Sequence, residues 1–191
     1  MSGRRSWNYQ GPKMLAILAL IFGRYERALG IFSNMLQRWP EDDYLLSSRA
    51  HLHAQAGHHA LAIADAQALV RLHPRRSAAD WFNLGFLLEA TGSLHDAEAA
   101  FRRALEMDPK LDRGWYGLGL TLIGQRRFDE AVAALKRNTE LQPMSPSGWY
   151  QLARVHVDRQ DPDEARRVIR HLRGFEPKVA AQLERETGLA A

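Results

Sequence analysis

Apolar residues recur along this chain at the three- and four-residue intervals of helices that bury one face. Trp81, Leu84 and Leu88 are separated by three and then four positions, so their side chains share one helical face. A short polar turn and a second apolar pattern, LHDAEAAFRRAL at 94–105, follow them. Ala, Leu and Arg are plentiful whereas Val, Ile and Thr are few, which also favours helix over strand. The pattern therefore predicts pairs of helices.

The helix pairs repeat at a nearly constant interval. Successive intervals of 34, 35, 34 and 34 residues separate five prolines, Pro40, Pro74, Pro109, Pro143 and Pro177. Proline lacks a backbone N–H and restricts the residue before it, so each of these prolines is expected to stop a helix. Each period is therefore predicted to run helix, tight turn, helix and stop.

The three later periods share a pattern of specific residues. Residues 78–111 carry Trp81, Leu84, Gly85, Leu88, Ala97, Phe101 and Pro109. Residues 112–145 carry Trp115, Leu118, Gly119, Leu122, Ala131, Leu135 and Pro143, and residues 146–179 carry Trp149, Leu152, Ala153, His156, Ala165, Ile169 and Pro177. The pattern resembles that of the tetratricopeptide repeat family, W-x2-L-G-x2-Y, then A-x3-F, then P, in about 34 residues.

Extension of the same frame toward the N-terminus predicts two further, less regular repeats. The predicted organisation is a basic leader (1–8), five repeats (9–42, 43–76, 78–111, 112–145 and 146–179) and a C-terminal capping helix and tail (180–191). The resemblance implies an all-α fold, a tetratricopeptide-repeat α-solenoid of five helix pairs and a cap. Stacking of neighbouring pairs would bury the apolar faces that one pair cannot bury alone.

The stretch MLAILALIF at 14–22 follows the basic leader and has three competing interpretations. A membrane anchor needs about 20 apolar residues, more than this stretch provides. An export signal would be followed by a small-residue cleavage site, which is absent here. The repeat frame instead predicts the first helix of repeat 9–42, with Gly23 in the turn. Because this helix is apolar all round, something must cover it: the leader through Trp7 and Tyr9, a second copy of the chain by self-association, or a partner.

Composition and charge exclude some kinds of chemistry and of binding partner. The chain has a net charge of +4 and contains no cysteine, which excludes disulfides and thiolate chemistry. Residues 1–40 hold six Lys or Arg against one Glu, so anionic lipid or nucleic acid could be attracted there. The Arg pairs at 102–103, 126–127 and 166–167 have no interleaved aromatic residues for base stacking. We therefore predict no nucleic-acid partner.

No pattern of catalytic or metal-binding residues stands out. His51, His53, His58 and His59 cluster in the sequence, but residues two apart on a helix point in different directions, which disfavours a shared metal. No nucleophile motif, carboxylate pair or phosphate-binding glycine loop is recognisable. We therefore predict a protein that is not an enzyme and that has no metal site and no cofactor.

The family resemblance implies that the first helices line a concave groove where partners bind. The candidate partner-binding residues are Phe82, Asn83, Phe86, Glu89, Arg113, Tyr116, Leu120, Tyr150, Gln151 and Arg154. Their aromatic members could instead serve packing, and Arg154 has Asp158 four residues on as an expected ion-pair partner. The groove positions hold no lysine of the kind that some family members use to grip chaperone C-termini.

These observations predict a cytoplasmic, non-catalytic protein–protein interaction module, such as an adaptor, co-chaperone or assembly factor. Its partner would be a peptide or helix of another protein, held in the concave groove. The alternative is a membrane-peripheral assembly subunit that docks through the basic leader and the apolar helix at 14–22.

Overall fold

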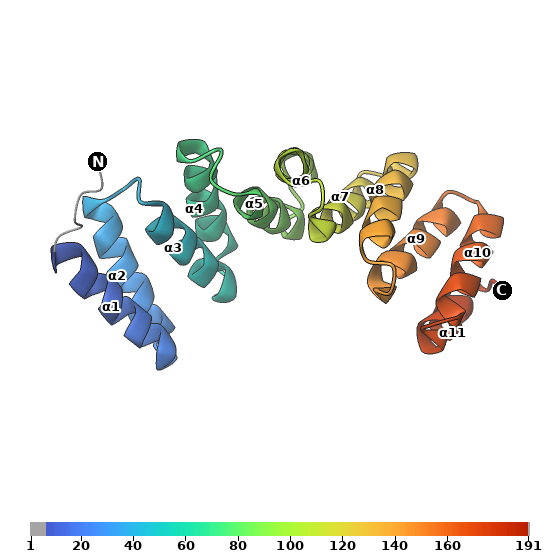
Figure 1. Ribbon diagram of the computed structural model, residues 1–191, viewed down its shortest axis with the longest axis horizontal. Helices are drawn as coiled ribbons and strands as arrows, with labels where there is room; N and C mark the ends of the chain where they lie inside the picture. Colours follow the sequence, from blue (N-terminus) through green and yellow to red (C-terminus); the bar gives the residue numbers. More distant parts are fainter. Residues whose placement is uncertain (1–6, 191) are drawn as a thin grey trace. The chain divides into compact units, whose positions relative to one another are not determined.

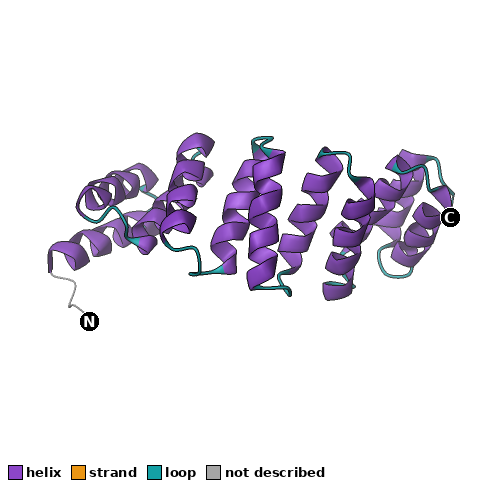
Figure 2. Cartoon of the chain, turned by 90° about the horizontal axis from the view of Figure 1, so that it is seen from above, coloured by secondary structure: helices purple, strands orange, loops and turns teal. Residues whose placement is uncertain are grey.

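The computed structural model describes residues 7–190, and this range contains helices and turns but no strand (Figures 1 and 2). Its helices are α1 (Trp7–Ile21), α2 (Tyr25–Arg38), α3 (Asp43–Gln55), α4 (His59–Leu72), α5 (Ala78–Ala90), α6 (Leu94–Met107), α7 (Asp112–Gly124), α8 (Phe128–Leu141), α9 (Pro146–Asp158), α10 (Pro162–Arg173) and α11 (Pro177–Thr187). The all-α class predicted from the period is confirmed.

The chain divides into two compact units, Met1–Leu87 and Leu88–Ala191, with the boundary inside α5. In the first unit, α1 packs on α2, α2 on α3, and α3 on α4. In the second, each helix from α6 to α11 packs on the next, and α9 also contacts both α7 and α11. Contacts restricted to near neighbours along the chain are those of a repeat architecture.

Proline ends the second helix of most pairs as expected. The helices α2, α4, α6 and α8 each stop two residues before Pro40, Pro74, Pro109 and Pro143. Pro177 differs, because α10 already ends at Arg173 and Pro177 is the first residue of α11. The first position of a helix suits proline, since the N–H at that position has no partner inside the helix.

A tryptophan hydrogen bond recurs at the start of each regular pair. The indole Nε1 of Trp115 donates to the carbonyl oxygen of Pro109 at 2.9 Å, and Trp149 donates to Pro143 at 2.8 Å. Trp81 makes the equivalent bond to the carbonyl oxygen of Pro74 at 3.0 Å. The recurring tryptophan and proline thus act together, because the indole N–H ties the new helix to the carbonyl of the proline that follows the previous helix.

The turn inside each helix pair contains one residue in the left-handed region. Glycine occupies this place in the first three turns, with φ of 67° at Gly23, 76° at Gly57 and 81° at Gly92. In the last two turns it is occupied by Arg126 with φ of 60° and Gln160 with φ of 61°. Side chains with a Cβ rarely adopt this conformation, so these two turns carry backbone strain.

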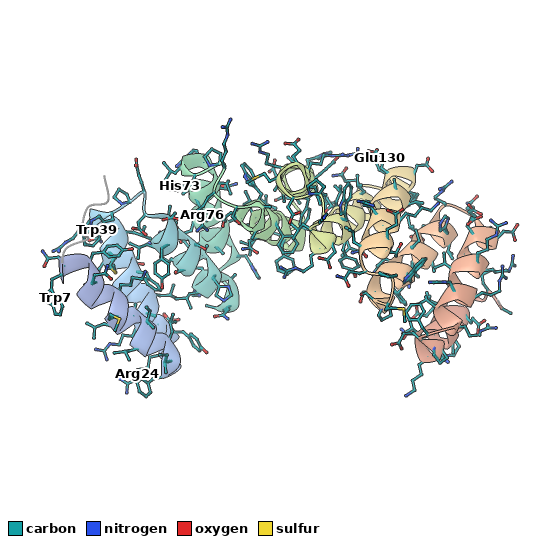
Figure 3. All side chains as sticks on the ribbon, in the orientation of Figure 1. Trp7, Arg24, Trp39, His73, Arg76 and Glu130 are labelled. Carbon is teal, nitrogen blue, oxygen red and sulfur yellow. The ribbon has the colours of Figure 1, made fainter. Side chains whose placement is uncertain are left out.

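The helix predicted from MLAILALIF is present as part of α1, which also includes Trp7 and residues of the expected leader. Its inward face is formed by Tyr9, Ala16 and Ala19, and Tyr9 packs edge-on against Trp39 with the ring centroids 5.1 Å apart. Trp7 is 86% exposed and points away from the helix pair (Figure 3). The rest of the predicted leader, residues 1–6, lies outside the described residues. Within 7–190, therefore, the outward face of α1 is not covered.

Candidate functional site

The candidate residues of the first unit lie on α5. Phe86 is 58% exposed, and its ring stacks on that of the half-buried Phe82 with the centroids 6.5 Å apart. Asn83 is exposed on the same helix, and Glu89, just past the unit boundary, is half-buried. Phe86 in particular contributes apolar surface that packing inside the chain does not use.

In the second unit the candidate residues lie on α7 and α9, which contact each other. On α7, Tyr116 and Leu120 are half-buried and Arg113 is exposed. On α9, Tyr150 and Gln151 are half-buried and Arg154 is exposed. Because Tyr116 and Tyr150 are partly buried, their rings pack inside the unit and also leave some surface accessible to a partner.

One end of this surface is closed by α11 through Glu186. The Tyr150 hydroxyl donates to Glu186 Oε2 at 2.6 Å, and Arg154 Nη1 lies 3.1 Å from the same oxygen. The carboxylate that Arg154 bonds is thus Glu186, which corrects the expected pairing with Asp158. These hydrogen bonds, first that from Tyr150, lower the pKa of Glu186, and the bond to Glu186 raises the pKa of Tyr150.

Sequence reasoning missed Glu186 because its role depends on tertiary packing. Glu186 lies within the expected capping helix and tail (180–191), and nothing in the sequence indicates which first-helix residues it meets. The only local signal is its spacing from Gln182, whose side-chain amide donates to Glu186 Oε1 at 2.7 Å. Contact between α11 and α9 brings this carboxylate to the expected binding surface.

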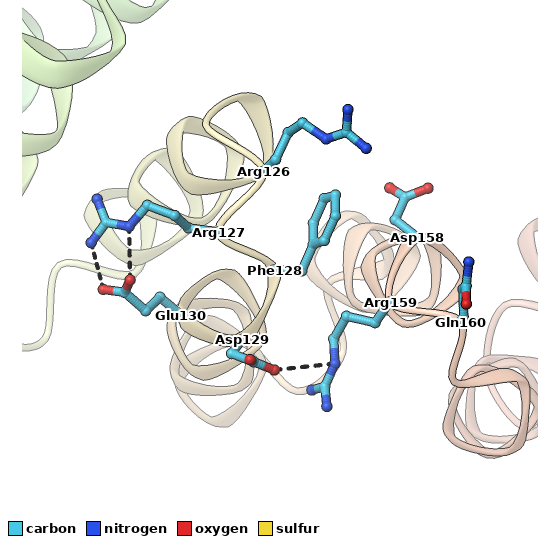
Figure 4. Close-up of a pocket in the computed structure, with 8 residues that line it drawn as sticks. All are labelled: Arg126, Arg127, Phe128, Asp129, Glu130, Asp158, Arg159 and Gln160. Carbon is cyan, nitrogen blue, oxygen red and sulfur yellow. Dashed lines mark hydrogen bonds and ion pairs between the residues drawn. The ribbon is translucent and has the colours of Figure 1, made fainter.

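A hollow of the same unit lies at the α7–α8 and α9–α10 turns (Figure 4). Its lining consists of Arg126, Arg127, Phe128, Asp129, Glu130, Asp158, Arg159 and Gln160. Arg127 bonds Glu130 at 2.6 Å, and Arg159 lies 3.3 Å from Asp129. Basic and acidic side chains are equal in number here and largely pair with each other, so the hollow has no bias toward an anion or a cation.

The histidines do not form a metal site in the described part of the chain, where no group of three potential ligands converges. His53 and His58 come together, with ring centroids 5.8 Å apart. His156 is fully buried, and neither ring nitrogen has a hydrogen-bond partner among the residues that the structure describes. Burial lowers its pKa, and Asp161, with a carboxylate oxygen 3.6 Å from Nδ1, offsets part of that effect.

None of the helices within residues 7–190 is long and apolar enough to cross a membrane. This finding agrees with the sequence argument against a spanning anchor at 14–22.

Solved structures with the same fold extend over nearly the whole chain. A MamA protein matches with a TM-score of 0.84 and 18% identity, covering 95% of this chain and 96% of that one. MamA from Desulfovibrio magneticus RS-1 matches with a TM-score of 0.80 and 19% identity over 95% and 97%. YrrB, described as a tetratricopeptide repeat protein with an unusual peptide-binding site, matches with a TM-score of 0.80 and 16% identity over 89% and 88%. Because the sequence identities are below 20%, these matches show a shared fold only.

Sequence comparison identifies the family directly. No curated protein matches the chain. The family model described as the tetratricopeptide repeat matches at residues 13–75, 47–112 and 116–177, which together span most of the sequence. The pattern of Trp, Leu, Gly, Ala and Pro in the later periods is thus the pattern of this family. The chain belongs to the tetratricopeptide repeat family.

Proposed function

We propose that this protein is a non-catalytic cytoplasmic module that holds a peptide or helix of another protein against the aromatic surfaces of its first helices. Membership of the family supports a protein partner. The adaptor or assembly-factor role fits better than a chaperone-tail clamp, because the candidate positions lack lysine. The peptide-binding site described for YrrB, which shares the fold, supports a peptide as the form of the partner.

The observation that carries the proposal is the exposed aromatic surface of α5. Phe86 stacks on Phe82 yet remains 58% exposed, so its ring can still be buried by a partner. Aromatic side chains in such positions are typical anchors of protein interfaces. Tyr116 and Leu120 on α7 offer half-buried surface of the same character.

The bond between Arg154 and Glu186 changes the expected chemistry of the partner. Arg154 alone would favour an acidic residue in the bound segment. Because Glu186 already occupies it at 3.1 Å, the α9 end of the surface is electrostatically satisfied within the chain. We therefore propose that the bound segment is recognised by its apolar side chains, and that an acidic residue in it adds little.

The test is affinity capture from the native cell with the wild type and with Phe86→Ala plus Tyr116→Ala. Loss of an aromatic anchor costs about 2 kcal/mol in binding, or roughly thirtyfold in affinity. The captured partner should therefore be lost from the double variant. Leu61→Ala is the matched control, because Leu61 is an apolar side chain of α4 that is 54% exposed and outside the proposed surface.

Circular dichroism would establish that both variants keep the wild-type helical signal. Undiminished capture by a folded double variant would place the partner elsewhere on the chain. Equal losses in the double variant and in Leu61→Ala would show that capture follows general exposed apolar surface, and would also contradict the proposal.

A further inference from the structure

The outward face of α1 is apolar from Met14 to Ile21, and Trp7 adds an exposed ring at the start of the helix. Trp7 is 86% exposed and Ile21 70%, Met14 and Leu18 between them are also exposed, and Phe22, the residue after α1, is 73% exposed. The spacing of Trp7, Met14, Leu18 and Ile21 by seven, four and three residues puts them on one side of the helix. Contiguous exposed apolar surface of this kind usually marks a docking site.

Basic residues outnumber acidic ones around this face, where the exposed Glu26 lies between Arg24 and Arg27. Glu26 is the first acidic residue of the chain, so the whole of α1 and everything before it contains none. Arg24 lies at the opposite end of α1 from Trp7 (Figure 3), and Arg27 follows in α2. Lys13, the charged residue inside α1, is directed toward α3, with Nζ 3.6 Å from the ring centroid of Tyr44.

The basic residues at both ends argue against a second copy of the chain as the occupant of this face. In the sequence, Arg4 and Arg5 precede α1, and Arg24 follows it. A parallel pairing would bring Arg24 beside its own counterpart, and an antiparallel pairing would bring it toward the basic N-terminal end. Like charges brought together at an interface are unfavourable, and Glu26, the one acidic residue among residues 1–40, is outnumbered by six Lys or Arg.

The geometry points to the surface of an anionic lipid bilayer as the occupant, with α1 lying in the plane of the interface. An apolar face with tryptophan and phenylalanine near its ends suits the boundary between headgroups and acyl chains, where these rings concentrate. The flanking arginines match the negative surface potential of anionic lipid. Bilayer docking uses residues other than those of the proposed partner-binding surfaces, so it goes beyond the proposed function.

The test is co-sedimentation of the full chain with vesicles of phosphatidylglycerol and phosphatidylcholine, beside vesicles of phosphatidylcholine alone. The wild type should bind the anionic vesicles more strongly. Binding should weaken between about 0.1 M and 1 M salt, because the Debye length falls from ~10 to ~3 Å. Arg24→Glu plus Arg27→Glu should reduce binding to the anionic vesicles by at least about tenfold, since each basic residue contributes roughly fivefold.

Leu18→Ser plus Ile21→Ser tests the apolar part of the interaction. Both side chains are exposed, so the fold should persist while binding to the anionic vesicles falls by at least about tenfold. Leu61→Ser is the matched control and should bind as the wild type does, because Leu61 is an exposed apolar residue of α4.

The inference would be overturned if either double variant bound the anionic vesicles as well as the wild type does. It would also be overturned if the wild type bound both kinds of vesicle equally, or bound neither. Light scattering adds another decisive outcome. A wild-type dimer that Leu18→Ser plus Ile21→Ser converts to monomer, without vesicle binding by either, would assign the face to a second copy. None of these results depends on Phe86 or Tyr116, so failure here is distinguishable from failure of the proposed partner binding.

Discussion

The two units place different chemistry at equivalent positions of the repeat. In the first unit, Arg49 on α3 and Asp65 on α4 form a bidentate ion pair at 2.6 and 2.7 Å, and Arg49 also bonds Ser33 of α2. Sixty-nine residues further on, after one interval of 35 and one of 34, Leu118 and Ala134 hold these positions in the second unit and are buried. The same fold therefore tolerates either a charged or an apolar interior at this place.

The comparison shows which interactions each unit depends on. A buried ion pair contributes little compared with apolar residues of similar volume, but loss of one partner leaves a costly unpaired charge. The second unit instead depends on the close approach of α7 to α8 at Gly119. A Cβ built on Gly119 would lie 2.8 Å from the Leu135 side chain, which only glycine avoids. The first unit should thus be sensitive to loss of charge, and the second to added volume.

The largest expected effect is that of Asp65→Ala. It removes the carboxylate and leaves the Arg49 guanidinium, about three quarters buried, without its partner. We expect the free energy of unfolding to fall by about 3 kcal/mol, the lower end of the range for breaking a buried pair, because Arg49 keeps some contact with water. Urea unfolding followed by circular dichroism would measure it.

Arg49→Leu plus Asp65→Ala is the matched control for this variant. It gives the first unit the Leu and Ala that the second unit has at Leu118 and Ala134. Because neither charge is left alone, most of the lost stability should return. If the double variant is as unstable as Asp65→Ala, the units differ in more than this pair.

Gly119→Leu should have the next largest effect. The new side chain would overlap Leu135 and push α7 from α8, at a cost of about 1 to 3 kcal/mol. Arg137→Leu, an equally large change at an exposed position of α8, should shift the thermal midpoint little. Equal midpoints for the two variants would show that close approach at Gly119 does not matter.

The sequence predicted the features that recur with the period. Leu118, Leu122 and Ala131 are buried as the apolar stripe and small-residue register require, and the left-handed turn at Gly23 lies where the repeat frame put it. These features depend on local spacing alone, which is why a single sequence reveals them.

The ion pairs that the sequence did not predict join residues at non-equivalent places of different helices. Arg49 and Asp65 are 16 residues apart, and Glu186 meets Arg154 across 32 residues. No periodicity relates such partners, so only the packing of the helices identifies them. The candidate surface shares this limit, because spacing indicates which residues face one side but not how far each is buried.

His156 gives the next effect, and it depends on pH. This buried histidine takes the place that Leu122 has one repeat earlier. Burial lowers its pKa below the usual 6.5, with Asp161 opposing and Arg159 and Lys136 assisting. The folded state therefore binds fewer protons at His156 than the unfolded state does. The free energy of unfolding is thus unaffected by this histidine above pH 6.5 and declines as the pH falls below that value.

His156→Leu should remove this dependence. It also eliminates two buried ring nitrogens without partners, so the variant should be more stable than the wild type by about 1.5 kcal/mol, with the gain increasing at acidic pH. Thermal midpoints measured in buffers on both sides of pH 6.5 provide the comparison. A wild type and variant with parallel pH profiles would show that His156 is not the group responsible.

The smallest expected effect concerns the strained turns at Arg126 and Gln160. Their φ angles of 60° and 61° match those of the glycine turns, and both side chains line the hollow of Figure 4. A left-handed residue with a Cβ costs roughly 1 kcal/mol, whereas glycine costs less in the turn but gives the unfolded chain more freedom. Arg126→Gly should therefore raise the free energy of unfolding by about 0.5 kcal/mol, and Gly57→Arg should lower it by about 1 kcal/mol. Urea unfolding of both variants measures the difference. A loss of stability in Arg126→Gly would mean that the arginine side chain makes contacts that outweigh the strain of its backbone.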